Sequence, residues 1–206
     1  MYYKHGSLEI SGGNTKVGDD TLILNMCSST DCPSSKLGLC KLGEKCYALK
    51  AEKRYLGCLP YRRRQADYWK NTGAPQIAAD ILAVVKRIKR RITFVRLSEA
   101  GDFETQEDVD KASLLAVLLK KHGIITYTYS ARSDLDFSKC AALLVKGSGH
   151  NGGNNGKTIA RPRKSIPDVG GLYHENMETF LVCKENCRKC TFCKTDKGFN
   201  IVFPIH

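Results

Sequence analysis

Ile92-Thr-Phe-Val-Arg-Leu97-Ser-Glu-Ala-Gly-Asp102-Phe103 joins a predicted buried strand to an acidic loop near the middle of the chain. Its first six residues are rich in β-branched and aromatic types, which predicts a buried strand. The polar residues after Leu97 indicate that the strand ends in a loop, and two of them, Glu99 and Asp102, are acids three positions apart. In α/β folds the chemistry gathers at the carboxyl ends of the strands, so this loop is a candidate site.

Strands and helices alternate on both sides of that stretch. A helix from Pro75 to Ile88 precedes the strand, because the apolar residues of that segment share one face. A second helix follows it, opened by a capping box at Thr105 to Asp108 and ended by Gly123. Further apolar runs predict strands at 21–26, 124–129, 142–145, 180–182 and 201–203.

This alternation favours right-handed βαβ units and a parallel sheet. We therefore expect an α/β fold, an incomplete (β/α) barrel-like parallel sheet of about five to six strands with a Cys-rich C-terminal segment. The chain of 206 residues suits a single α/β domain, 1–206. Within it, residues 1–20 are expected to form an irregular lead-in and residues 183–193 the Cys-rich, cluster-binding segment.

The last four of the ten cysteines fall between residues 183 and 193. Cys183, Cys187, Cys190 and Cys193 follow a predicted strand with the spacing C-x3-C-x2-C-x2-C. This run resembles the C-x2-C-x2-C-x3-C loop of bacterial ferredoxins with its gaps in the opposite order. Structural zinc sites more usually use two hooks separated by a longer stretch. We expect a [4Fe-4S] cluster on these four residues, with zinc as one alternative and reduced or disulfide-linked cysteines as the other.

A second group, Cys32, Cys40 and Cys46, lies where a loop rich in Pro and Gly leads from the strand at 21–26 into a helix. Cys46 is expected in the first turn of that helix, where the helix dipole favours a thiolate. These three cysteines are also candidate metal ligands. Each group can bind its own cluster, both can converge on one cluster, or the C-terminal four can form a zinc knuckle that only fastens the end of the chain.

Glu99 and Asp102, together with Arg132 after the strand at 124–129, are the candidate catalytic residues. The two carboxylates can face one cleft and serve as acid, base or cation ligand. Arg132 can bind an anion or balance the charge of a cluster. The structural alternative is that Asp102 caps a turn while Glu99 pairs with Arg132.

The composition and net charge restrict the classes of partner that we expect. The chain has neither a signal peptide nor an apolar run of membrane-spanning length, so we expect a cytoplasmic protein with reduced cysteines and no membrane partner. The formal net charge of +12 favours polyanions, and Tyr61–Trp69 mixes arginines with aromatic rings that can stack on bases. Nucleic acid is therefore a candidate partner, although a solvated basic surface explains the same charge.

Several of these elements resemble the phage "gene product 88" family. The resemblance spans nearly the whole chain and rests on Ser11–Lys16, Cys32–Ala48, Ser98–Phe103, Tyr129–Arg132 and the C-terminal cysteine run. That family has no established activity to transfer. The resemblance implies a phage or prophage origin, and hence the cytoplasm of a bacterial host.

A more distant resemblance is to radical S-adenosylmethionine enzymes. These are partial α/β barrels in which a three-cysteine loop after the first strand binds a [4Fe-4S] cluster and leaves one iron open to the cofactor. Cys32, Cys40 and Cys46 occupy the matching place, but their spacing of x7 and x5 departs from the x3 and x2 of those enzymes. The resemblance implies S-adenosylmethionine as a cofactor to test.

The sequence therefore predicts one function and two alternatives. The first is an iron–sulfur protein with a redox or cluster-organised binding role and an electron-transfer or small-molecule partner. The second is a radical S-adenosylmethionine-like enzyme with its substrate near Glu99, Asp102 and Arg132. The third is a basic nucleic-acid-binding protein with a structural zinc.

Overall fold

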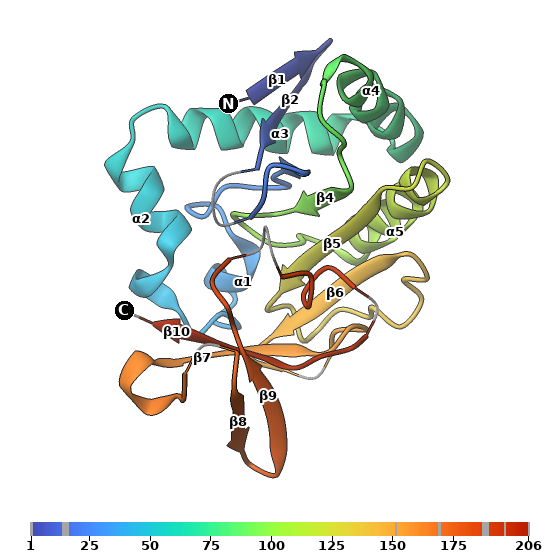
Figure 1. The fold of residues 1–206 in the computed structure, drawn as a ribbon. Helices are drawn as coiled ribbons and strands as arrows, with labels where there is room; N and C mark the ends of the chain where they lie inside the picture. The colour runs from blue at the N-terminus through green and yellow to red at the C-terminus, as the bar shows by residue number, and fades with distance from the viewer. Residues whose placement is uncertain are drawn as a thin grey trace.

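The computed structural model describes residues 2–13, 17–150, 152–168, 170–186, 190–195 and 197–205. The strands of these residues form one continuous sheet in the order β1-β2-β3-β4-β5-β6-β7-β10-β9-β8 (Figure 1). Their bounds are β1 Tyr2–His5, β2 Leu8–Gly12, β3 Thr21–Leu24, β4 Phe94–Leu97, β5 Ile125–Ser130, β6 Leu143–Ser148, β7 Lys157–Pro162, β8 Leu172–Glu175, β9 Glu178–Val182 and β10 Ile201–Ile205.

The longer helices all precede β5 in the chain. None of the helices in the described part of the molecule combines the length and the apolar character needed to cross a membrane. The α-helices are α1 Pro33–Lys36, α2 Tyr47–Arg54, α3 Cys58–Asn71, α4 Ala74–Arg87 and α5 Gln106–Lys120, and the short 3-10 helices are η1 Gly43–Lys45 and η2 Arg163–Ser165.

The predicted incomplete (β/α) barrel is wrong, because the structure has an open mixed sheet of ten strands. Seven neighbouring strands, β3, β4, β5, β6, β7, β10 and β9, do run parallel. Antiparallel strands extend both edges, however, with β2 and β1 beside β3 and with β8 beside β9. β1 and β8 each pair with one neighbour, so the sheet does not begin to close.

The physical reason lies in the connections after β5. The segment 131–142 between β5 and β6 contains no helix, and neither do the described residues between β6 and β7. A (β/α) barrel needs a helix after each strand to build its outer layer, and that layer is missing here. The strand count was also too low because β1 and β8 are short and half or more exposed, and because β7 mixes polar with apolar residues and lacks an apolar run. The N-terminal residues, expected to be irregular, form the β1–β2 hairpin.

Where the sequence signal was periodic, the predicted elements are confirmed. α4 has Pro75 in its first turn. α5 begins with the predicted capping box, in which the Thr105 hydroxyl accepts from the backbone N–H of Asp108 and the Asp108 carboxylate accepts from that of Thr105. Cys46 was expected in the first turn of this helix but lies just before it, as the N-cap of α2.

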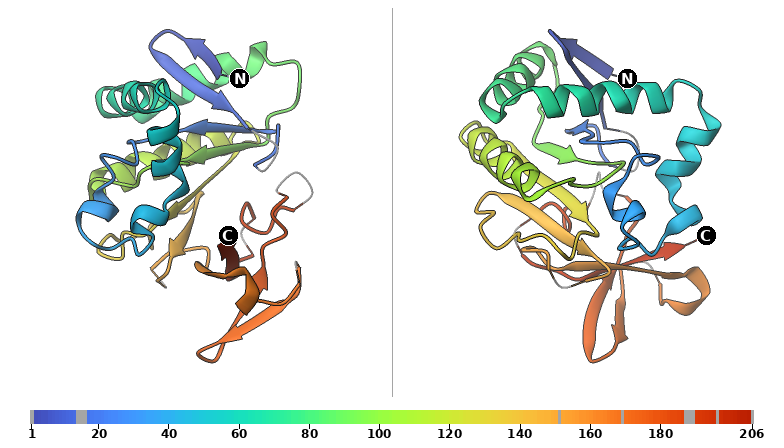
Figure 2. Two further views of the ribbon diagram at one scale, coloured as in Figure 1. Left: turned by 90° about the vertical axis from the view of Figure 1, so that its left-hand side faces the viewer. Right: turned by 180° about the vertical axis from the view of Figure 1, so that it is seen from behind.

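The helices cover one face of the sheet. The main core lies between α3, α4 and α5 on one side and strands β2 to β6 on the other. Side chains alternate along β4, so Val95 and Leu97 belong to this core while Phe94 and Arg96 face the opposite side. Figure 2 shows that the chain between β9 and β10 runs over that opposite, helix-free face.

Gly101, in the loop after β4, is predicted to be the costliest glycine of this region to replace. Its φ is +76°, and a Cβ placed there would lie 2.1 Å from Cys27 Sγ and 2.7 Å from the Cys27 carbonyl oxygen. Gly101→Ala should therefore cost about 1–2 kcal/mol of backbone strain and about 1–3 kcal/mol more for the overlap, measured by urea unfolding.

Gly123→Ala is the matched control, because Gly123 has a similar φ of +73° and open space around its Cβ position. This variant should lose only the unfolding free energy that corresponds to backbone strain, without the loss caused by steric overlap. Equal losses of unfolding free energy in the two variants would contradict the close packing of Cys27 against Gly101.

Candidate metal centre

The segment between β9 and β10 is fastened to the helix-free face by Lys194. This side chain is only 2% exposed. Its Nζ donates to the carbonyl oxygen of Val17 at 2.8 Å and to the Thr21 hydroxyl at 3.2 Å, and lies 4.5 Å from the centroid of the Phe94 ring. The end of the Cys-rich segment is thus held against the start of β3 and β4.

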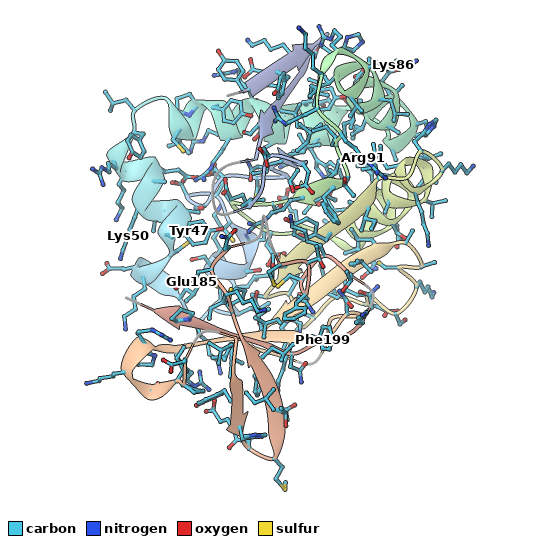
Figure 3. The ribbon with its side chains drawn as sticks, viewed as in Figure 1. Tyr47, Lys50, Lys86, Arg91, Glu185 and Phe199 are labelled. Carbon is cyan, nitrogen blue, oxygen red and sulfur yellow. The ribbon has the colours of Figure 1, made fainter. Side chains whose placement is uncertain are left out.

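A second buried lysine, Lys146 of β6, holds the same segment nearer its end. Its Nζ donates to the carbonyl oxygens of Asn155 and Phe199, the latter at 2.7 Å. Burial lowers the pKa of Lys146 from its ordinary value. Hydrogen bonds from two buried cations thus position this segment, which Figure 3 marks by Glu185 and Phe199.

The segment and the sheet enclose a cavity of ≈ 40 Å³. Cys183, Cys190 and Cys193 line this cavity together with Arg96 and Tyr129. Three of the four predicted C-terminal ligands therefore meet at one place, although a loop separates the first from the other two. The fourth, Cys187, lies outside the described residues.

Arg96 brings a half-buried positive charge to the cavity from the middle of β4. Its Nη2 donates to the Tyr47 hydroxyl at 3.2 Å, and that hydroxyl donates to the carbonyl oxygen of Glu99 at 2.7 Å. Its Nε is buried and has no hydrogen-bond partner among the described residues. A buried N–H without an acceptor is costly, and a negatively charged group in the cavity would satisfy it.

Tyr129 places a hydroxyl beside one of the three thiols. Its side chain is in hydrogen-bond contact with Cys193, and its ring centroid lies 5.1 Å from the Arg96 guanidinium. Burial raises the pKa of Tyr129 well above its ordinary value, so the residue stays a neutral phenol. Its hydroxyl therefore keeps a hydrogen that it can donate to the sulfur of Cys193.

The donor types that line this cavity suit a metal–thiolate centre, but the placement of the described side chains does not. Thiolates are the ligands of iron–sulfur clusters and of structural zinc, and the unsatisfied Nε of Arg96 complements their negative charge. No three His, Cys, Asp or Glu side chains of the described residues are placed to hold a metal ion. At ≈ 40 Å³ the cavity is also small. As they are placed, the described side chains therefore do not fit a metal ion or a cluster.

The N-terminal cysteines occupy a different place, around α1 and the start of α2. Cys32 is the N-cap of α1 and Cys46 that of α2. Burial raises the pKa of Cys32 to about 11 and also raises that of Cys40, and negative charge on the neighbouring cysteines and on Asp102 adds to both shifts. The three thiols thus share a neighbourhood of like charge, in contrast to the cationic cavity of the C-terminal group.

Asp102 connects the loops that follow three parallel strands. Its carboxylate accepts hydrogen bonds from Ser34 Oγ at 2.5 Å, Ser130 Oγ at 2.7 Å, and the backbone N–H groups of Ala131 and Phe103 at 2.8 and 2.9 Å. Burial raises the pKa of this carboxyl, against the lowering effect of the four donors. The geometry gives Asp102 a positioning role, and catalysis by it stays a prediction.

Arg132 also holds a loop together. It is buried and donates to the carbonyl oxygens of Phe103 and Glu104 at 2.6 and 2.9 Å, while its other nitrogens form a two-point ion pair with Asp134 at 2.8 and 2.7 Å. The pairing of Glu99 with Arg132 weighed from the sequence is therefore not the one observed. Glu99 is partly exposed, and its charge acts on Arg96.

Sequence reasoning did not single out Arg96, Lys146 or Lys194. The sequence did contain a signal for Arg96 and Lys146, because each is a cation inside an otherwise apolar strand. A charge buried there requires a partner. The sequence contained no signal for the role of Tyr47, because its hydrogen bond with Arg96 joins residues 49 positions apart.

Comparison with known proteins adds the family. A family model described as Gene product 88 matches residues 8–145, more than half of the chain. The chain belongs to the gene product 88 family. The resemblance seen in the sequence is thereby confirmed. No curated protein and no solved structure matches the chain. The part matched to the gene product 88 family contains the N-terminal cysteine group and Asp102, and it ends before the Cys-rich segment.

Proposed function

We propose that this member of the gene product 88 family is an iron–sulfur protein whose centre is bound by Cys183, Cys187, Cys190 and Cys193. One observation carries the proposal. The three described thiols of that set line a single cavity, which Arg96 also lines with a half-buried cation whose buried Nε–H has no acceptor among the described residues. A cluster ligated by four thiolates carries net negative charge, and a cationic, partly dehydrated cavity stabilises such a charge.

A [4Fe-4S] cluster bound there supplies one-electron redox chemistry. The chain's own residues hold and surround it. The buried lysines fasten the segment, Tyr129 donates to the sulfur of Cys193, and the exposed Tyr47 lies at the outer end of Arg96. The proposed role is electron transfer, or binding organised by the cluster, with a redox or small-molecule partner in the cytoplasm of a phage-infected bacterium.

The ligand assignment is tested by cysteine footprinting. The protein, purified without oxygen, is alkylated with iodoacetamide before and after removal of metal by a chelator, and the modified cysteines are identified by mass spectrometry. The four C-terminal cysteines should be protected before chelation and modified after it. Cys58, partly exposed on α3, is the internal control and should react in both samples.

Equal modification of the C-terminal four with and without chelator would contradict the proposal. Protection of Cys32, Cys40 and Cys46 in their place would move the centre to the N-terminal loop. That result would revive the resemblance to the radical S-adenosylmethionine enzymes, which incubation of the reduced protein with S-adenosylmethionine would then test.

A further inference from the structure

We propose that the exposed side of α2, together with the turn that follows it, binds single-stranded nucleic acid. This inference goes beyond the iron–sulfur function and does not depend on it. Figure 1 shows α2 at the outer edge of the molecule, on the opposite side from α4 and α5. The surface of α2 combines cations with exposed aromatic rings, which are the two features by which proteins hold unpaired nucleotides.

Three exposed cations of α2 lack a carboxylate partner in the described part of the chain. Lys50, Lys53 and Arg54 belong to none of its ion pairs. The carboxylate of the helix, Glu52, is buried and accepts hydrogen bonds from Arg62 and from the backbone of the loop after β3. The positive charge of this surface therefore attracts a polyanion from outside the chain.

Exposed apolar side chains lie among these cations. Tyr47 and Tyr55 are 55% and 57% exposed, and Leu56 is 95% exposed. The Tyr47 ring is held in place, because its hydroxyl donates to the carbonyl oxygen of Glu99 at 2.7 Å. The Arg54 guanidinium lies 5.5 Å from the centroid of the Tyr55 ring. Aromatic rings and guanidinium planes are the flat surfaces on which unpaired bases stack.

The segment Tyr61–Trp69, which mixes arginines with aromatic rings in the sequence, does not offer such a surface. Arg62 is buried and pairs with Glu52, while Tyr68 and Trp69 are 6% and 1% exposed. The two other arginines of the segment also pair with carboxylates.

An anionic membrane surface would attract the same cations. Helices that lie in a membrane interface carry Leu, Phe or Trp side chains opposite the charged face. On that side α2 has Ala48, which is buried in the protein. The observations therefore favour nucleic acid.

The test measures the binding of a labelled oligothymidylate and a labelled oligouridylate, each of about twelve nucleotides, to the full chain at several salt concentrations. The variant Lys50→Gln/Lys53→Gln/Arg54→Gln removes three charges from α2. The slope of log K against log[salt] is about −0.7 for each phosphate contact with a single strand, so the slope should become less steep by about 2.

The matched control is Lys86→Gln/Lys89→Gln/Arg91→Gln. It removes the same number of charges from exposed residues at and after the end of α4, two of which Figure 3 shows on the opposite side of the molecule from Lys50. This control should keep the affinity and the salt dependence of the wild type.

Tyr55→Ala tests stacking separately and covers the case in which the triple variant of α2 does not fold. It should weaken binding to both oligonucleotides by about tenfold. Tyr55→Phe keeps the ring and should bind as the wild type does.

Binding to either oligonucleotide with these losses would support the inference, and the tighter of the two would identify DNA or RNA as the ligand. Absence of binding, equal losses in the α2 and α4 variants, or binding to phosphatidylserine vesicles in place of both oligonucleotides would overturn it. Iron and sulfide analysis of the same preparation reports on the proposed function separately, so either proposal can fail alone.

Discussion

Cys190→Ser is expected to leave the protein without bound iron and sulfide. A serine hydroxyl is a poor substitute for a thiolate, and a cluster that loses one of four ligands also loses the fixed position of the loop that carries them. The variant should fold, because Cys190 is partly exposed and lies outside both apolar cores. Iron and sulfide per chain, measured after anaerobic purification, give the result.

Cys58→Ser and Cys32→Ser are the controls for this loss. Both positions are partly exposed, and neither lines the cavity beneath the Cys-rich segment. Both variants should keep the iron and sulfide content of the wild type. Retention of metal by Cys190→Ser together with its loss from Cys32→Ser would place the centre at the N-terminal cysteines and reject the assignment made here.

Asp102→Asn is expected to destabilise the fold by about 1–3 kcal/mol although it preserves the size of the side chain. Each carboxylate oxygen accepts one hydroxyl and one backbone N–H, Ser130 and Phe103 on one and Ser34 and Ala131 on the other. In asparagine one of these oxygens is replaced by an NH2 group. Whichever oxygen is replaced, the NH2 group then faces a backbone N–H, so two donors meet and that hydrogen bond is lost. Asp102→Ala leaves all four donors without acceptors and should cost about 3 kcal/mol or more.

Urea unfolding of the two variants checks these values, with Asp67→Asn as the control at an exposed position on α3. Asp67→Asn should leave stability within about 0.5 kcal/mol of wild type. If Asp102→Asn were equally silent, Asp102 would not be the acceptor that ties the loops after β3, β4 and β5 together, and a protonated carboxyl in a catalytic role would become the better account of its burial.

The parts of the fold that the sequence predicted are those in which local chemistry dictates one outcome. The capping box at Thr105 and the first-turn proline of α4 satisfy helix ends without help from the rest of the chain. The apolar run of β3 requires burial on both faces, which its all-buried residues show. These elements lie before β6, where the chain still alternates strand with helix.

The remainder depends on contacts that are remote in sequence. β7 and β8 carry mixed polar residues and become strands because β10 and β9 pair with them. The absence of a helix between β5 and β6 follows from a loop that Arg132 and Asp134 hold by their own hydrogen bonds. No periodicity in the sequence predicts either feature, so the alternation of predicted strands and helices led to the wrong expectation of a barrel.

The candidate site likewise has features that the sequence predicted and features that only the structure shows. Cysteine spacing indicated the two groups of thiols, and strand ends indicated Asp102 and Arg132, which the structure brings to neighbouring loops. The cysteine spacing did not indicate that the Cys-rich segment crosses the helix-free face of the sheet. It also did not indicate that Arg96 lines the cavity beneath that segment. That arrangement depends on Lys194 reaching Val17, 177 positions earlier in the chain.

Anaerobic purification followed by iron, sulfide and zinc analysis is the most direct test of whether the protein binds an iron–sulfur cluster. We expect about four iron and four sulfide per chain, with a broad visible absorption that reduction bleaches. About eight of each would show that the N-terminal cysteines bind a second cluster beside the first. One zinc per chain without sulfide, or no bound metal in protein kept free of oxygen throughout, would contradict the iron–sulfur assignment.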